Sequence, residues 1–113
     1  MRMNHSIYIL DDDADLLVLL SGYIEDLGFQ PICFNCSHRF LAEQASFNRG
    51  DVLILDLLMP GIDGIEVLRA LSSYENKPNI ILISGYDESV LHSAVQLAKI
   101  HDLPVIGSIS KPV

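Results

Sequence analysis

Short apolar runs alternate along this chain with segments in which apolar residues recur at every third or fourth position. A short apolar run bounded by turn residues predicts a buried strand, and the wider spacing predicts an amphipathic helix. Five runs are of the first kind, and we expect each of them to form a strand: Ile7–Leu10, Ile32–Phe34, Val52–Leu55, Ile80–Ile83 and Pro104–Ile109.

Amphipathic segments fill the four intervals between these runs. Asp13 or Asp15 is suited to cap the first predicted helix, and Gly28 stands where a helix commonly ends. Ser37 is the candidate N-cap of the second helix, which is short. The apolar positions that define the helices are Leu16, Leu17, Leu20, Ile24 and Leu27; Phe40, Leu41 and Ala45; Ile65, Leu68 and Leu71; and, from a start near Asp87, Val90, Leu91, Ala94, Val95, Leu97 and Ala98.

The order of the predicted elements is one strand followed by four helix–strand pairs. Strands that are covered on both faces read as continuous apolar runs, as the runs at 7–10, 52–55 and 80–83 do. Helices on both faces of a parallel sheet make a doubly wound fold, so we predict an α/β domain with one five-stranded parallel sheet. In such sheets, ligands bind at the carboxyl ends of the strands.

Length and composition indicate a single globular domain over residues 1–113. Hydrophobic residues make up 50% of the chain and charged residues 19%, so it can bury a core without a disulfide or metal. The 7 Lys and Arg against 15 Asp and Glu give a net charge of −8. This charge argues against nucleic acid or an anionic membrane as a partner, and favours a divalent cation or a basic partner.

The apolar runs are shorter than the roughly 18 residues of a membrane helix. The N-terminus also lacks the long apolar region and cleavage site of a signal peptide. We therefore expect a cytoplasmic protein that does not act in a membrane.

Cys33 and Cys36 form a lone C-x-x-C pair. A zinc site would need two more ligands, of which only His38 is near, and a redox dithiol would need the start of a helix after a strand. We interpret the pair as two partly buried, reduced thiols, with metal or redox chemistry as the alternative.

Polar residues follow four of the predicted strands. The first strand is followed by Asp11–Asp13, the third by Asp56, the fourth by Ser84 and the fifth by Lys111. The carboxyl ends of parallel strands share one edge of a sheet, so we expect these side chains to meet. Converging carboxylates repel one another unless a cation neutralises them, and their oxygens suit Mg²⁺. A hydroxyl and an ammonium group nearby would suit a phosphoryl group.

Each of these residues also has an ordinary structural interpretation. An Asp after a strand often caps a helix or forms a turn, and a single Ser84 or Lys111 would be a turn residue or a solvated charge. The coincidence at four strand ends, rather than any one residue, favours a functional site.

The same segments resemble the receiver domain of two-component response regulators, over nearly the whole chain. The matching segments are Ile9–Asp13, Leu55–Gly64, Ile83–Gly85 and Ser110–Pro112. The resemblance implies a flavodoxin-like fold and a signalling domain rather than an enzyme. Such a domain is phosphorylated by a histidine kinase or a phosphotransfer protein and controls an output domain in cis.

The resemblance also implies a role for each matching residue. Asp56 would be the phosphoacceptor, Lys111 would bind a phosphoryl oxygen, and Ser84 would be the switch hydroxyl. The acidic pair Asp11 and Asp12 would hold Mg²⁺, with Asp12 and Asp56 as direct carboxylate ligands and the backbone carbonyl of Leu58 as the remaining protein ligand. The Lys111–Pro112 peptide bond would be cis.

The chain departs from the family pattern in three places. Ser108 stands where the family often has an aromatic residue, which puts the usual coupling through an aromatic rotamer in doubt. The segment 87–103 looks longer than usual. Together with the segments Ser84–Asp87 and Gly107–Pro112, the long fourth helix resembles that of receivers joined to EAL-type cyclic-di-GMP phosphodiesterase domains. A DNA-binding output domain is the alternative.

The third departure is that the chain stops at Val113, where the family continues into a fifth helix. We therefore expect a truncated receiver domain whose output domain lies outside this chain. One face of the sheet would then expose apolar side chains of the first, third and fifth strands, which favours a homodimer.

Two other functions remain open. A phosphatase of the haloacid-dehalogenase type would use Asp11 as nucleophile and Asp13 as acid and base, but it leaves the segment 56–64 unexplained. A receiver-like module that binds proteins without being phosphorylated would need none of the reactive residues, all of which are present.

Overall fold

The computed structural model describes residues 5–44, 46–59, 61, 63–85 and 88–111. Its elements are β1 (Ser6–Leu10), α1 (Ala14–Asp26), β2 (Gln30–Phe34), α2 (Ser37–Glu43), β3 (Val52–Asp56), α3 (Gly64–Leu71), β4 (Asn79–Ser84), α4 (Glu88–Ile100) and β5 (Val105–Ser110). The predicted order of strands and helices is confirmed. Ala45, Asp87 and Pro112, and with Pro112 the predicted cis peptide bond, lie outside the described residues.

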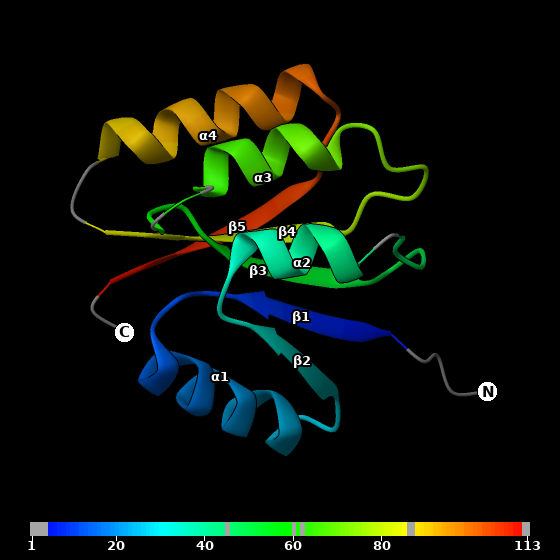
Figure 1. The fold of residues 1–113 in the computed structure, drawn as a ribbon, viewed down its shortest axis with the longest axis vertical. Helices are drawn as coiled ribbons and strands as arrows, with labels where there is room; N and C mark the ends of the chain where they lie inside the picture. The colour runs from blue at the N-terminus through cyan, green and yellow to red at the C-terminus, as the bar shows by residue number, and fades with distance from the viewer. Residues whose placement is uncertain (1–4, 45, 60, 62, 86–87, 112–113) are drawn as a thin grey trace.

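The strands form one parallel sheet in the spatial order β2-β1-β3-β4-β5, as Figure 1 shows. The predicted doubly wound α/β fold is therefore confirmed. The register pairs Leu10 of β1 with Leu55 of β3, and Asp56 of β3 with Ile83 of β4. Three neighbouring strands thus bring their carboxyl ends to the same edge of the sheet.

The helices cover the two faces of the sheet unequally. Among the described residues, α1 lies on one face, and α2, α3 and α4 lie on the other (Figure 1). The smaller core, under α1, consists of Ile9, Leu16, Leu20, Ile24, Ile54 and Ile83. The larger core includes the fully buried side chains Leu10, Phe40, Leu53, Leu55, Val67, Leu68, Leu71, Ile80 and Leu82.

The face under α1 is covered better than the sequence predicts. Ile9, Ile54 and Ile83 are buried, so the expectation that β1 and β3 expose their apolar side chains here is wrong for Ile9 and Ile54, whereas Ile7 and Val52 on the same two strands are half-buried. The reason is that α1 packs three buried side chains across these strands. Ile81 of β4 and Ile109 of β5 are half-buried as well, and Ile106 of the edge strand β5 is 59% exposed.

The two predicted helix caps have different outcomes. Asp13 caps α1 as predicted, because its carboxylate accepts hydrogen bonds from the backbone N–H groups of Asp15 and Leu16. The prediction for Ser37 is wrong: Cys36 occupies the N-cap position of α2 and makes no capping bond through its side chain. Ser37 is instead buried inside the first turn, where its hydroxyl donates to Met59 Sδ at 3.9 Å.

We expect copies of this chain to associate weakly at high concentration through the β5 edge. An exposed edge strand without charged residues is prone to pairing, and residues 104–110 carry none. Light scattering over a concentration series should show a rising mean mass, and Ile106→Glu should lower that rise. Gln96→Glu, on the exposed side of α4, is the control for added charge. A mass of one copy at every concentration would contradict the expectation.

Candidate functional site

Two buried carboxylates stand at the ends of adjacent strands. Asp11 directly follows β1, and its backbone N–H extends the ladder to β2 by donating to the Phe34 carbonyl at 3.1 Å. Asp56 is the last residue of the central strand β3. Both side chains are buried, and parallel pairing of β1 with β3 places them side by side. The sequence-based expectation that they meet is confirmed.

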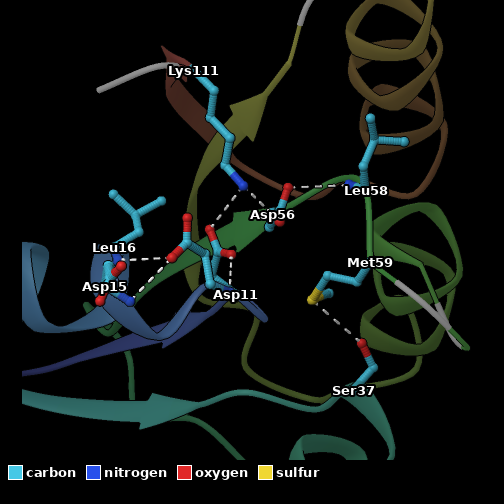
Figure 2. Close-up of polar contacts among 9 residues, drawn as sticks. Asp11, Asp15, Leu16, Ser37, Asp56, Leu58, Met59 and Lys111 are labelled. Atoms are coloured by element: carbon cyan, nitrogen blue, oxygen red, sulfur yellow. Dashed lines mark hydrogen bonds and ion pairs between the residues drawn. The ribbon is translucent and has the colours of Figure 1, made fainter.

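Each carboxylate is oriented by the same local turn. Asp11 Oδ1 accepts a hydrogen bond from the backbone N–H of Asp13 at 2.9 Å, and Asp56 Oδ1 accepts one from that of Leu58 at 3.1 Å. Asp commonly bonds the backbone two residues ahead, which is why it favours such turns. The second oxygen of each carboxylate points towards Lys111 Nζ (Figure 2).

Lys111 supplies the positively charged side chain of this site. Its backbone N–H donates to the Ser84 carbonyl at 2.7 Å, which places the residue where the paired strands β4 and β5 both end. Its Nζ donates to Asp56 Oδ2 at 3.1 Å and lies 3.5 Å from Asp11 Oδ2 (Figure 2). The side chain is only 28% exposed, so water screens these charges less than on the open surface.

A close approach of backbone to backbone holds the loop after β3 in place. The N–H of Gly64, at the start of α3, donates to the Leu57 carbonyl at 3.2 Å. A Cβ atom at Gly64 would lie 2.5 Å from the Asp56 carbonyl oxygen, so only glycine fits there. Asp63 caps α3 through the N–H of Glu66. The Asp63-Gly64 pair of the sequence thus fixes α3 against the end of β3.

The charges of the site are unbalanced. Burial raises the pKa of Asp11 to about 6; the hydrogen bond from Asp13 opposes this rise, and the negative charge of Asp56 adds to it. Burial lowers the pKa of Lys111, but the hydrogen bond and charge of Asp56, helped by Asp11, outweigh burial and leave that pKa above its usual value. One ammonium group therefore serves two buried carboxylates.

The donor set fits a hard divalent cation. Asp11 Oδ2 is buried and has no hydrogen-bond partner among the described residues, since 3.5 Å from Lys111 Nζ is too long for one. Asp11, Asp12 and Asp56 each offer an oxygen, and these oxygens lie within 4.8 Å of one another. A divalent cation held by these oxygens would satisfy the free oxygen and offset the excess negative charge.

Ser84 is buried at the end of β4, the strand that lies between β3, which ends at Asp56, and β5, which Lys111 follows. With Lys111 and Ser110 it lines an open pocket of about 570 Å³, whose wall on α4 is formed by Glu88, Leu91, His92 and Val95. Sequence reasoning missed this pocket. Its wall on α4 comes from residues at helical spacing, Glu88, Leu91, His92 and Val95, and nothing in the sequence indicated that they lie opposite Ser110 and Lys111.

Other sequence candidates lie outside this arrangement. Asp13 caps α1 with its carboxylate, which leaves it unsuited to act as the acid and base of a dehalogenase-type phosphatase. Cys33 and Cys36 are both free, and they are exposed rather than partly buried as predicted. Within the described ranges the acidic triad is the only set of three or more such ligands close together, so the thiols belong to none.

Of the helices that the structure describes, none combines the length and apolarity that crossing a membrane requires.

Comparisons with known proteins identify relatives. The model of the response regulator receiver domain family matches residues 7–113. Response regulator protein TmoT of Ectopseudomonas mendocina is 37% identical over 82 residues, which are 73% of this chain and 37% of that protein. The chain therefore spans little more than a third of that relative's length.

Solved structures agree with this assignment. A response regulator from Colwellia psychrerythraea is 41% identical, with a TM-score of 0.85 over 98% of this chain and 87% of that one. Full-length FixJ from B. japonicum is 25% identical, with a TM-score of 0.82 over 99% of this chain and 52% of that one.

Without a divalent cation, the free energy of unfolding should fall as the pH rises through about 6. The pKa of Asp11 is raised from 3.8 to about 6, so folding favours its protonated form. This contribution to the free energy of unfolding is complete below the pKa that Asp11 has in the unfolded chain. It is lost as the pH rises through the pKa that Asp11 has in the folded protein. Urea unfolding in EDTA should measure this. Between pH 4 and pH 8, the free energy of unfolding of Asp11→Asn should rise by roughly 1–2 kcal/mol relative to that of the native protein.

Asp26→Asn, on the exposed side of α1, is the control and should show no such gain. A difference between Asp11→Asn and the native protein that stays constant with pH would contradict the assignment of this titration to Asp11.

Proposed function

This chain belongs to the response regulator receiver domain family, and we propose that it accepts a phosphoryl group on Asp56 and uses it to control an output domain. The family makes it a signalling module rather than an enzyme with an external substrate to turn over. The observation that carries the proposal is the buried Asp56 carboxylate, which is held between the Lys111 ammonium group and the Leu58 N–H. The donor would be a histidine kinase or a phosphotransfer protein.

In the proposed reaction, an oxygen of Asp56 attacks the phosphorus atom of a phosphohistidine. The new O–P bond forms as the N–P bond breaks, and the imidazole leaves with the electron pair of the broken bond. Attack of one anion on another is opposed by charge repulsion. Lys111, already 3.1 Å from Asp56 Oδ2, is placed to offset this repulsion by binding a phosphoryl oxygen.

The proposed metal ligands are the carboxylates of Asp11, Asp12 and Asp56, with the backbone carbonyl of Leu58. The free, buried Asp11 Oδ2 supports this set, because it has no other partner among the described residues. Bound Mg²⁺ supplies positive charge that stabilises a phosphoryl group in transfer. The chain itself holds the carboxylates in position by the two turns at Asp11 and Asp56.

We propose Ser84 as the hydroxyl that responds to the new phosphoryl group. It lines one pocket together with Lys111 and α4, whose residues 88–93 include no fully buried side chain, although Val90 and Leu91 are half-buried. A helix start held by two half-buried side chains can shift with a smaller loss of contact than one anchored by fully buried side chains. Because Ser108 is small, the signal would leave through α4 and β5 rather than through an aromatic rotamer.

The rest of the proposal concerns the whole protein. TmoT and full-length FixJ are both longer than this chain, which supports an output domain in cis. That domain would bind DNA or act as an EAL-type phosphodiesterase, while this domain, with its net charge of −8, would bind no nucleic acid itself. A cytoplasmic location and a homodimer complete the proposal.

Mg²⁺ should bind with a dissociation constant in the millimolar range or below. Calorimetric titration of the native protein and Asp12→Ala should show a loss in affinity that exceeds the roughly tenfold typical of losing an outer partner of a metal. Asp15→Ala, an exposed position on α1, should retain the native affinity. Equal affinities of the native protein and Asp12→Ala would place the metal elsewhere.

Phosphoramidate with Mg²⁺ should add one phosphoryl group to the native protein, as mass spectrometry would detect. Asp56→Asn should abolish this uptake and Lys111→Ala should slow it. Ser84→Ala should still be labelled, but its amide spectrum should respond less to labelling.

The failures of this experiment separate the alternatives. If Asp56→Asn is still labelled and Asp11→Asn is not, the dehalogenase-type reaction is the correct one. If the native protein takes up no phosphoryl group although it binds Mg²⁺, the domain is a protein-binding module.

A further inference from the structure

The pocket beside Lys111 combines an apolar wall with hydroxyl-bearing residues. Leu91 and Val95, four positions apart on α4, contribute the apolar wall, and each is only half-buried. Four helical residues rise about 6 Å, so these two side chains present a short apolar strip that is comparable in width with one six-membered ring. Ser84 and Ser110, at the ends of β4 and β5, line the same pocket. A molecule with an apolar and a polar end can therefore contact both kinds of lining.

Ser84 brings a buried hydroxyl group to this pocket. The residue is only 5% exposed, and its backbone carbonyl accepts a hydrogen bond from the Lys111 N–H. Its hydroxyl group has no hydrogen-bond partner among the described residues. A ligand that bonds this hydroxyl would gain a hydrogen bond with little competition from bulk water. The pocket volume of about 570 Å³ is also in the range that ligand sites occupy.

The charges around the pocket favour a neutral ligand. Lys111 Nζ already donates to Asp56 and lies 3.5 Å from Asp11, so it is not free to pair with an anionic ligand. These two carboxylates, and Glu88 in the lining of the pocket, would also repel an anion. A cationic ligand would lie beside the Lys111 ammonium group. Its other possible partner, Glu88, is exposed, and an exposed ion pair contributes little.

We propose that this pocket binds a small, neutral aromatic molecule that carries a hydroxyl group. Its ring would pack against Leu91 and Val95, and its hydroxyl group would bond to Ser84. A ring is favoured over an alkyl chain because a rigid ligand loses less conformational entropy on binding. Binding itself does not depend on phosphorylation. Given the proposed function, such a ligand would oppose phosphorylation by holding the Ser84 hydroxyl, and phosphorylation would weaken its binding by the same factor.

The probe is 4-ethylphenol, and 4-ethylbenzoate is its anionic counterpart. Titration of the unphosphorylated native protein, followed by amide nuclear magnetic resonance, should show saturable shifts at Ser84, Leu91 and Val95 with 4-ethylphenol. The dissociation constant should be about 1 mM, and 4-ethylbenzoate should bind at least about tenfold more weakly. The titration contains no Mg²⁺ and no phosphoryl donor, so its failure would not bear on the proposed function.

Two variants test the two walls separately. Val95→Lys should weaken the binding of 4-ethylphenol at least about tenfold, because it places a charge in the apolar wall. Gln96→Lys, exposed on α4 and outside the lining of the pocket, is the matched control and should bind as the native protein does. Ser84→Ala should lose about fivefold in affinity, as expected for one hydrogen bond. The proposal is overturned if the shifts do not saturate, if 4-ethylbenzoate binds as tightly as 4-ethylphenol, or if Ser84→Ala or a folded Val95→Lys binds 4-ethylphenol as the native protein does.

Discussion

Two buried carboxylates share a single ammonium group in this domain, and the rest of the site depends on that imbalance. Lys111 Nζ is within hydrogen-bond distance of Asp56 but not of Asp11, whose Oδ2 is buried without a hydrogen bond among the described residues. Burial and the neighbouring charge raise the pKa of Asp11 to about 6. Such a site is most stable when a further positive charge enters it, so a divalent cation is favourable there.

The parallel sheet makes this arrangement possible. Carboxylates on adjacent strands can be held close only if the backbone around them is fixed, and the turns at Asp11 and Asp56 and the tight contact at Gly64 fix it. The start of α4, by contrast, has no buried side chain and borders the pocket beside Lys111. Rigid strand ends next to a helix start without fully buried side chains would allow a local charge change to alter a distant surface.

Much of this could be predicted from the sequence, because the strands are continuous apolar runs and the polar residues stand directly after them. The meeting of Asp11, Asp56 and Lys111 follows from parallel pairing alone. Other features depend on tertiary packing. Ser37 reads as a helix cap but is buried against Met59, and α1 covers β1 and β3 more fully than its sequence indicates. The pocket beside α4 exists only because β5 lies opposite it.

The most direct test is to measure the titration of the Asp11 carboxyl carbon by nuclear magnetic resonance, with and without Mg²⁺. Without the cation we predict a pKa near the value of about 6 that burial imposes. With saturating Mg²⁺ we predict that the pKa falls below the ordinary value of 3.8, because the cation favours the charged form. An ordinary pKa in both conditions would contradict the central claim that this carboxylate is held buried and unneutralised until a cation binds.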